Sequence, residues 1–461
     1  MPTSHSTLKI ISNPLRGFAK ARKLYLALML VIIAVLGNVT VTLAATPTLL
    51  RRPYVQQVYT NSLIVAWTTA ESGASEVHYG TSDFSQIAAA TSTFFNTGES
   101  GTYDTYYLHQ ATLTGLTADT TYQYKIFTSG SDITPGGSIN VRSAKPTSST
   151  AFRFAALGDS GQGNQAQANV AAQMLAAGPN LVLHTGDVIY SGPDHTSYEE
   201  LYFQYYDDLI ESVWLAPSPG NHDTEGDNGQ SYVDVFINPE NGASDPIERE
   251  MYYSFDYGNA HFSIVTSEES YSSGSNQYNW LAADLAATSQ YWKFVVFHVP
   301  PYFTSSSQNL SRPGGVASTL GPLFEQYDVD MVLSGDRHWY ERFKPIKDGQ
   351  LDTVENGAVL YVITGGGGTG LSGVGEWPWH NFTGEKAGVH HFTQFDVDGC
   401  ELHLTAIDAS GSVFDTYTLD RCEGPPIADF SADQQNGVAP LTVNFSDLSR
   451  RGPTGWSWAF G

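Results

Sequence analysis

Large hydrophobic residues recur at every second position between Thr46 and Lys145, as in Leu63–Trp67 and again in Tyr122–Ile126. Gly, Asp and Ser residues separate these runs. Such alternation is typical of strands that bury one face, and the frequent turns indicate antiparallel pairing. We therefore predict an all-β sandwich over residues 46–147.

The pattern changes after the Pro/Ser/Thr-rich segment Lys145–Thr150. Short apolar runs now alternate with segments of helical periodicity, such as Asn164–Ala177. The apolar runs are Phe152–Leu157, Leu181–Thr185, Phe294–Val299 and Met331–Ser334. This order predicts an α/β domain of layered sheets and helices over residues 148–423.

Residues 1–45 have the layout of a secretory signal peptide. Five cations and no acidic residue precede the apolar run Leu24–Leu36, and small residues follow at Leu43–Ala45. The cations are Lys9, Arg16, Lys20, Arg22 and Lys23. We expect cleavage near Ala45 and a secreted protein, extracellular or periplasmic, with no stable membrane insertion afterwards. An uncleaved N-terminal anchor is the alternative, although the apolar run is short for one.

The charge of the chain excludes one class of partner. Lys and Arg number 22 against 47 Asp and Glu, which gives a formal net charge of −25. A nucleic-acid-binding protein needs a basic groove, so we expect no nucleic acid partner. Since only 15% of the residues are charged, solubility rests on uncharged polar residues, which fits an exported protein.

The only two cysteines, Cys400 and Cys422, enclose two alternating strands with a turn at Ala409–Ser412. Arms of equal length on either side of the turn would place both sulfur atoms at the base of one hairpin. In an exported protein we predict a disulfide here, worth about 3 kcal/mol by loop closure. A pair of buried thiols is the alternative.

Five short polar motifs lie in the α/β domain, and three of them directly follow apolar strands. They are Gly158–Gly161, Gly186–Tyr190, Gly220–Asp223, Val295–His298 and Gly335–His338. Side chains at the carboxyl ends of strands gather where open α/β sheets bind ligands. Their carboxylate, amide, imidazole and phenol groups are more than one cation needs, so they predict a dinuclear metal site.

The order of these motifs resembles that of the purple acid phosphatases, within the calcineurin-like metallophosphoesterases. The resemblance covers about residues 46–422, including Trp339–Arg342 after the last motif. It implies a catalytic domain of two sheets flanked by helices, and a centre of Fe(III) with a divalent Zn, Mn or Fe ion. The implied roles are Asp159, Tyr190 and His338 on iron, Asp187 as the bridge, Asn221 and His298 on the divalent ion, and His222 facing the substrate in catalysis.

One position departs from the resemblance, because Asp336 stands where the related sequences have His. A carboxylate oxygen could still reach the second metal, so we predict Asp336 as a ligand. The centre then loses one positive charge, and its attraction for phosphate should weaken. A degraded second site, with phosphate binding but no turnover, is the alternative.

Two flanking segments resemble known modules. Residues 46–147 resemble a fibronectin type III module, with a tyrosine corner at Leu116–Tyr122. The segment 425–461 resembles the opening of a β-sandwich repeat of the polycystic-kidney-disease (PKD) type, cut short.

Several further residues have two interpretations each. His184 is more simply a packed histidine than a ligand, because it lies inside an apolar strand. Arg312 could bind a substrate phosphate oxygen or be a solvated loop residue, and His380 and His390–His391 could line the pocket or lie on the surface. Asn381 begins a glycosylation sequon.

The sequence therefore predicts a secreted acid phosphatase that hydrolyses phosphate monoesters to alcohol and inorganic phosphate. A phosphodiesterase or nucleotidase with the same metal core is one alternative. A surface-binding protein with a degraded metal site is the other. Nothing in the sequence determines the oligomeric state.

Overall fold

The computed structural model describes residues 45–190, 192–243, 248–305 and 314–422, with short pieces at 430–432, 441–447, 455 and 457. The predicted signal peptide, except Ala45, lies outside these residues, as do Arg312 and most of the segment 425–461. In that segment the structure describes one pair of antiparallel strands, β26 (Phe430–Ala432) and β27 (Phe445–Asp447).

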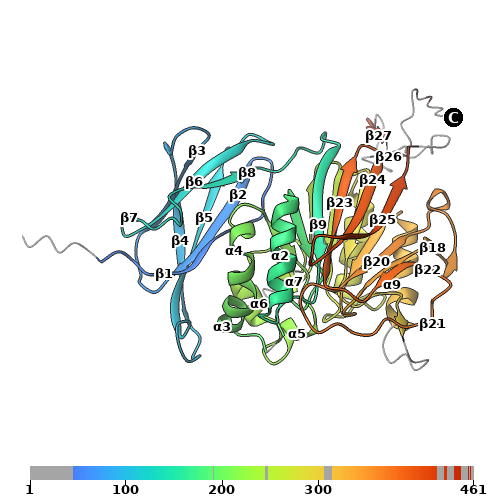
Figure 1. The fold of residues 1–461 in the computed structure, drawn as a ribbon. Coiled ribbons are helices and arrows are strands. Elements are labelled where there is room, and N and C mark those ends of the chain that lie inside the picture. The colour runs from blue at the N-terminus through green and yellow to red at the C-terminus, as the bar shows by residue number, and fades with distance from the viewer. Residues whose placement is uncertain are drawn as a thin grey trace, which may run out of the picture. The chain divides into compact units, whose positions relative to one another are not determined.

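Eight antiparallel strands form the all-β part near the N-terminus, in blue in Figure 1. They are β1 (Leu49–Gln56), β2 (Ser62–Thr69), β3 (Ser75–Gly80), β4 (Gln86–Asn96), β5 (Thr105–Thr114), β6 (Thr121–Thr128), β7 (Ser131–Asp132) and β8 (Ile139–Arg142). Strand β4 pairs with β3 through its first residues and with β5 through its last, so it joins two sheets. The alternation predicted from the sequence is confirmed in β6, where every second residue is buried, whereas β2 is buried on both faces from Val65 onward.

The predicted tyrosine corner has a matching contact. The backbone N–H of Thr117 donates to the Tyr122 hydroxyl over 2.9 Å, and Tyr122 is buried. A bond from this hydroxyl to the backbone a few residues upstream is the feature that defines such a corner. It fixes the turn that leads into β6.

Two mixed sheets form the centre of the domain that follows. The first has the order β11 (Leu215–Pro217), β10 (Leu181–His184), β9 (Ala151–Leu157), β23 (His391–Asp398), β24 (Glu401–Asp408) and β25 (Val413–Asp420). The second has the order β12 (Tyr253–Tyr257), β13 (Ala260–Ile264), β14 (Trp292–Val296), β16 (Met331–Ser334), β20 (Leu360–Thr364), β17 (Tyr340–Phe343) and β22 (Thr383–Ala387). Strands β9, β10 and β11 run parallel to one another, as do β13, β14, β16 and β20.

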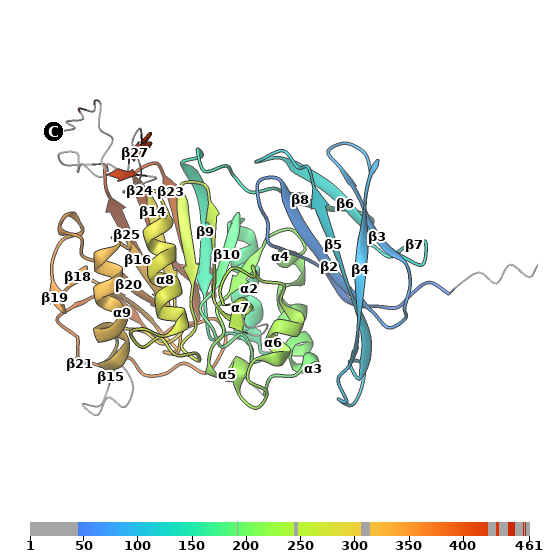
Figure 2. The same ribbon diagram turned by 180° about the vertical axis from the view of Figure 1, so that it is seen from behind.

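Helices lie beside these sheets, with α2 in front in Figure 1 and α8 and α9 in front in Figure 2. They are α2 (Gln165–Ala177), α3 (His195–Tyr198), α4 (Gln204–Ile210), α5 (Asn221–Thr224), α6 (Gln230–Val235), α7 (Glu248–Met251), α8 (Asn276–Ala287) and α9 (Gly314–Gln326). The helix predicted at 164–177 is confirmed: the Asn164 side chain accepts a bond from Gln167 N, and Gly178 ends the helix at a φ of 62°. None of the described helices is long and apolar enough to cross a membrane.

The two sheets meet in an aromatic core. The Phe154 ring of β9 stacks on Phe395 at 4.6 Å and meets Phe294 of the other sheet edge-on at 5.1 Å, centroid to centroid. Val295, next to Phe294, instead belongs to the same apolar cluster as Leu281 of α8. Each central strand is therefore apolar on both faces, because one face packs against the other sheet and the other face packs against helices. This explains why these strands are continuous apolar runs in the sequence.

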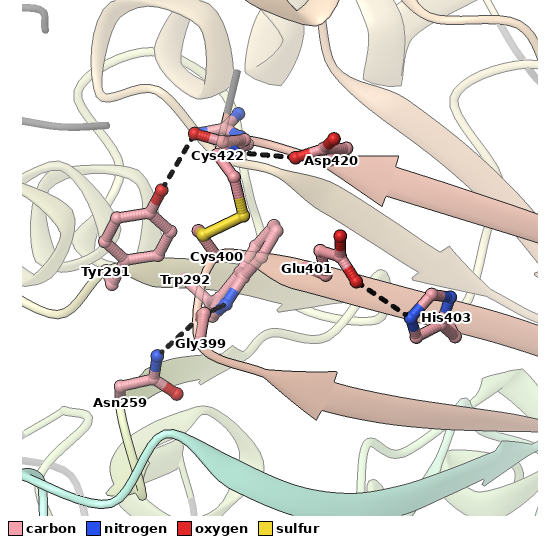
Figure 3. Close-up of a disulfide and its surroundings, with 10 residues drawn as sticks. Asn259, Tyr291, Trp292, Gly399, Cys400, Glu401, His403, Asp420 and Cys422 are labelled. Carbon is pink, nitrogen blue, oxygen red and sulfur yellow. Dashed lines mark hydrogen bonds and ion pairs between the residues drawn. A yellow bond between two sulfur atoms is a disulfide. The ribbon is translucent and has the colours of Figure 1, made fainter. Parts of the chain in front are cut away.

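The predicted disulfide between Cys400 and Cys422 is present, with the two Cα atoms 5.1 Å apart at the base of the β24–β25 hairpin (Figure 3). Beside it, the Gly399 carbonyl accepts bonds from the Trp292 indole at 3.0 Å and the Asn259 amide at 3.1 Å. Since Trp292 begins β14, these bonds tie the hairpin base to the other sheet.

Candidate metal centre

The five polar motifs lie at one edge of the sheets, just beyond the carboxyl ends of β9, β10, β11, β14 and β16. Several hydrogen bonds join the sheets at this edge, and two of them involve proposed ligands. His298 Nδ1 contacts the Thr185 carbonyl at 2.8 Å, and the backbone N–H of Asp336 donates to Asp159 Oδ1 over 3.1 Å. The edge is where the sequence predicts a site.

Three aspartates at this edge share an uncommon backbone conformation. The φ angles of Asp159, Asp187 and Asp336 are 57°, 50° and 62°, in the left-handed region. Each directly follows a glycine at the end of a strand. Asp enters this region more readily than most residues, and strained backbone gathers at functional sites. The chain therefore uses one type of turn to present three carboxylates, Asp336 included.

Glycines make room for the side chains of the centre. A Cβ atom on Gly220 would lie 2.3 Å from Asp187 Oδ1 and 2.9 Å from His298 Nε2. One on Gly335 would lie 2.6 Å from Asp159 Oδ2. Larger residues at these positions would displace the ligand atoms.

One side of the centre is formed by Asp159, Tyr190 and His338. The Tyr190 hydroxyl donates to Asp159 Oδ1 over 2.9 Å and lies 3.1 Å from His338 Nε2. His338 Nδ1 faces the Gly370 carbonyl at 2.8 Å, which directs Nε2 toward the centre. These three side chains therefore present one oxygen, one phenol and one imidazole nitrogen to the same point.

The other side is formed around Asp187 and His298. His298 Nε2 lies 3.3 Å from Asp187 Oδ1, which also accepts a bond from the backbone N–H of His222 at 2.9 Å. One ligand atom from each of Asp159, Asp187 and His298 falls within 4.8 Å of the others. Asp187 thus lies between the two sides, as a bridging ligand must.

Unpaired buried atoms at this place fit bound cations. Asp159 Oδ2, His298 Nε2 and Asp336 Oδ2 are buried and have no hydrogen-bond partner. An unsatisfied buried polar atom costs about 1–3 kcal/mol, so native proteins retain few of them. The donor set of carboxylates, imidazoles and a phenol suits iron and zinc.

The ionisable groups also fit a cation. Burial raises the pKa of Asp159 well above its usual range, and the charge of Asp187 adds to this rise. Burial likewise raises the pKa of Tyr190, and Asp159 and Asp187 raise it further. Burial opposes ionisation of Asp187, but His298 holds the pKa of that carboxyl below its ordinary value. Asp159 and Tyr190 therefore keep protons in the cation-free protein that a metal would displace, whereas the Asp187 carboxylate is already ionised.

Asn221 and His222 begin the short helix α5 directly after Gly220. The His222 ring packs against the Tyr190 ring with centroids 4.7 Å apart, and its side chain is 36% exposed. His222 therefore lies at the solvent side of the centre, where a substrate would approach, with Glu225 Oε2 3.5 Å from its Nδ1.

Asp336 lies at the same edge and carries an ion pair of its own. Its Oδ2 atom is 3.2 Å from Arg337 Nε, and its side chain is 13% exposed. The structure thus brings Asp159, Asp187, Tyr190, His298 and His338 into mutual contact. Asn221 and the Asp336 carboxylate lie at the same edge but make no direct contact with these ligand atoms.

Asp223 is a positioning residue for which the sequence analysis predicts no role. Its carboxylate accepts bonds from the backbone N–H groups of Val188 at 3.0 Å and Gly220 at 2.9 Å, and from the Tyr198 hydroxyl at 3.2 Å. It is fully buried, and burial raises its pKa to about 7. Asp223 therefore ties the loop of Asp187 to the loop of Asn221. In the sequence, only its position at the end of the Gly220–Asp223 motif indicated that Asp223 belongs to the site.

Three other histidines that the sequence offered have their hydrogen-bond or ring partners outside the proposed ligand set. His184 is buried and contacts the Ser160 hydroxyl at 2.9 Å, and burial lowers its pKa to about 3. Both positions suggested for His391, at the pocket or on the surface, are wrong. His391 begins β23 and is fully buried beside Thr364. His380 packs edge-on against Trp377 at 5.5 Å between centroids.

Two family models match the chain. The calcineurin-like phosphoesterase model matches residues 152–340, which contain every proposed ligand. The model of the purple acid phosphatase N-terminal domain matches residues 52–154. The chain carries a calcineurin-like metallophosphoesterase domain behind a purple acid phosphatase N-terminal domain.

Relatives of this metallophosphoesterase agree with the family models. Purple acid phosphatase 21 of Arabidopsis thaliana is 26% identical over 332 residues, covering 69% of each chain. An uncharacterized protein of Mycobacterium tuberculosis is 25% identical over 456 residues, covering 78% of this chain and 85% of its own. The solved purple acid phosphatase of yellow lupin seeds has the same fold, with a TM-score of 0.69 and 20% identity over 81% of this chain and 74% of its own.

Membership of this group implies a phosphoesterase hydrolase with a dinuclear metal centre that acts on phosphate esters. The Asp159, Asp187 and His298 cluster is a candidate part of that centre. The fold class predicted from the sequence, two sheets with flanking helices behind an all-β domain, is confirmed.

Proposed function

We propose that the protein is a secreted acid phosphatase that hydrolyses phosphate monoesters at a centre of one ferric and one divalent ion, Zn, Mn or Fe. The observation that carries this proposal is the set of buried ligand atoms that have no hydrogen-bond partner, together with the Tyr190 hydroxyl beside Asp159 and His338. A phenol among carboxylates and imidazoles is a donor set suited to a ferric ion.

Each proposed ligand comes from one of the five motifs. Asp159, Tyr190 and His338 would hold iron, Asp187 would bridge, and Asn221, His298 and Asp336 would hold the divalent ion. When bound, the two cations supply an activated water and neutralise the phosphoryl oxygens.

The side chains around this centre have roles in the reaction. His222, which packs on Tyr190 at the solvent side, donates a proton to the alcohol oxygen as the P–O bond breaks, or stabilises its charge. Asp223 holds His222 and Asp187 in register through the two loops that it joins. Arg312 remains a candidate phosphate ligand outside the described residues.

Export and the domain bounds belong to the same proposal. The signal-like residues 1–45 and the disulfide between Cys400 and Cys422 support a secreted protein. We propose a fibronectin-like domain at 46–147, a catalytic domain at 148–423 and a partial PKD-like segment at 425–461.

The test compares turnover of nitrophenyl phosphate with that of bis(nitrophenyl) phosphate across pH, together with element analysis of the purified protein. Two metals per chain and faster cleavage of the monoester at acidic pH are expected. Faster cleavage of the diester would make the protein a phosphodiesterase. Two metals without turnover, or no bound metal, would contradict an enzymatic role.

A further inference from the structure

Arg337 lies between two proposed ligands, Asp336 and His338, yet the proposed function gives it no part. Its Nε atom is 3.2 Å from Asp336 Oδ2, and its guanidinium carbon is 3.9 Å from the centroid of the Phe303 ring. Phe303 is buried, whereas the Arg337 side chain is 28% exposed. The guanidinium is therefore held on one face by an aromatic ring and on one edge by a carboxylate, beside the metal centre.

The hydrogen-bonding capacity of Arg337 is not used up by these contacts. Its contact with Asp336 lacks hydrogen-bond geometry, and both Arg337 Nε and Asp336 Oδ2 are buried without a hydrogen-bond partner. Arg342 differs, because its Nε and Nη2 atoms both donate to the Asp415 carboxylate, at 2.7 and 3.0 Å. The Nε atom is buried against Asp336, and the two Nη atoms donate to no side chain or carbonyl among the described residues, so they are the donors that remain for an incoming anion.

The charge of the site also calls for a cation here. An aspartate at position 336 brings a negative charge into a centre that must attract a phosphate ester, in a chain whose formal net charge is −25. The neighbouring guanidinium offsets that charge within 3.2 Å. Asp336 and Arg337 together are neutral, so the pair restores the charge that the carboxylate alone would remove.

We propose that Arg337 is a substrate-binding residue that donates hydrogen bonds to a phosphoryl oxygen of the ester. This inference rests on the proposed function. Phe303 keeps the planar guanidinium in place, and the ion pair with Asp336 holds it beside one proposed metal ligand. A guanidinium suits this role because its donors match two oxygens of one phosphate group.

The experiment measures the affinity of the metal-loaded protein for inorganic phosphate by calorimetry, together with its metal content. Arg337→Gln should keep both metals and bind phosphate about 10–100-fold more weakly, the range for a lost hydrogen bond to a charged group. Arg337→Lys should recover part of the loss, because it restores the charge but not the paired donors. The matched control is Arg153→Gln, since Arg153 forms an ion pair with Asp396 in the paired strands β9 and β23.

A second background separates substrate binding from support of Asp336. In the Asp336→His background no carboxylate remains for Arg337 to hold, so a supporting role would make Arg337→Gln silent there. Direct phosphate binding predicts that Arg337→Gln weakens phosphate affinity in both backgrounds. Silence in the second background, unchanged affinity in the first, or loss of a metal in Arg337→Gln would overturn the proposal.

The outcome for the parent protein distinguishes the two levels of inference. A parent that binds two metals and turns over monoesters, with Arg337 variants of unchanged phosphate affinity, refutes only the role of Arg337. A parent that binds neither metal nor phosphate refutes the proposed function, and the role of Arg337 with it.

Discussion

Two clusters of aspartate around a buried histidine, His261 and His298, can be compared in this protein, and they differ in how completely their atoms are hydrogen-bonded. In the cluster around His261, Nδ1 lies 2.7 Å from Asp256 Oδ1 and Nε2 lies 2.9 Å from Asp284 Oδ2. Ser254 and Ser263 donate to the two oxygens of Asp284, at 2.6 and 2.7 Å. Each of these acceptor oxygens already has a donor.

The candidate metal centre has similar residues but leaves Asp159 Oδ2 and His298 Nε2 without a hydrogen bond. Its aspartates lie in left-handed turns after strands, whereas Asp256 lies within β12 and Asp284 within α8. Composition and burial therefore do not distinguish a structural cluster from a binding site. Unpaired atoms on strained turns do.

The largest effect on turnover is expected for Asp187→Ala. Asp187 lies between both sides of the centre, so its loss should remove at least one metal and lower turnover by more than about 100-fold, beyond the range for outer partners of a metal. Element analysis and nitrophenyl phosphate turnover measure this. The matched control in the other cluster, Asp256→Ala, should keep both metals and full turnover. Two bound metals in Asp187→Ala would contradict the bridging role.

A smaller effect is expected at Asp336. If its carboxylate binds the divalent ion, Asp336→Ala should lose that ion and about 10–100-fold of turnover. Asp336→His should retain two metals and bind inorganic phosphate more tightly, because the centre regains a positive charge. Element analysis separates ligation from charge. Full activity with both metals in Asp336→Ala would remove Asp336 from the ligand set.

Tyr190→Phe tests the iron side by colour. The Tyr190 hydroxyl, held between Asp159 and His338, should bind ferric iron as phenolate and give a visible charge-transfer band. The oxidised parent should be pink to purple, and Tyr190→Phe should lose the band. The hydrogen bonds of Asp223 to the two loops do not involve the Tyr190 side chain, so they should remain. A visible spectrum with iron analysis decides this, and a variant as coloured as the parent would refute phenolate binding.

The sequence predicted the metal centre better than the structural cluster, for a physical reason. Asp159, Asp187 and Asp336 each follow an apolar run in the chain, so a local pattern reveals them. His261 and Asp284 meet only because α8 packs beside β13, and no local pattern records that contact. Asp223 and Arg337 lie inside motifs identified in the sequence, but each also contacts another loop, Asp223 through Val188 and Arg337 through Phe303, so their proposed roles required the structure.

The smallest effect on turnover, and the clearest on stability, is expected at His261. Burial opposes its charged form, but Asp256 and Asp284 raise the pKa of His261 to about 9. The pKa of a histidine in the unfolded chain is about 6.5. The cluster therefore contributes its full stabilisation, about 3 kcal/mol, below about pH 6.5 and loses it as the pH rises through 9.

The thermal unfolding midpoint of the parent should therefore fall as the pH rises from 6.5 to 9. His261→Gln should lower the midpoint at pH 6 and make it less dependent on pH, while keeping both metals. The control is His78→Gln, because the His78 side chain is 23% exposed against 8% for His261, and exposed ion pairs such as His78–Glu76 contribute little. A midpoint of His261→Gln that equals the parent's at pH 6 would show that the paired cluster does not stabilise the fold, and would remove the contrast with the metal centre.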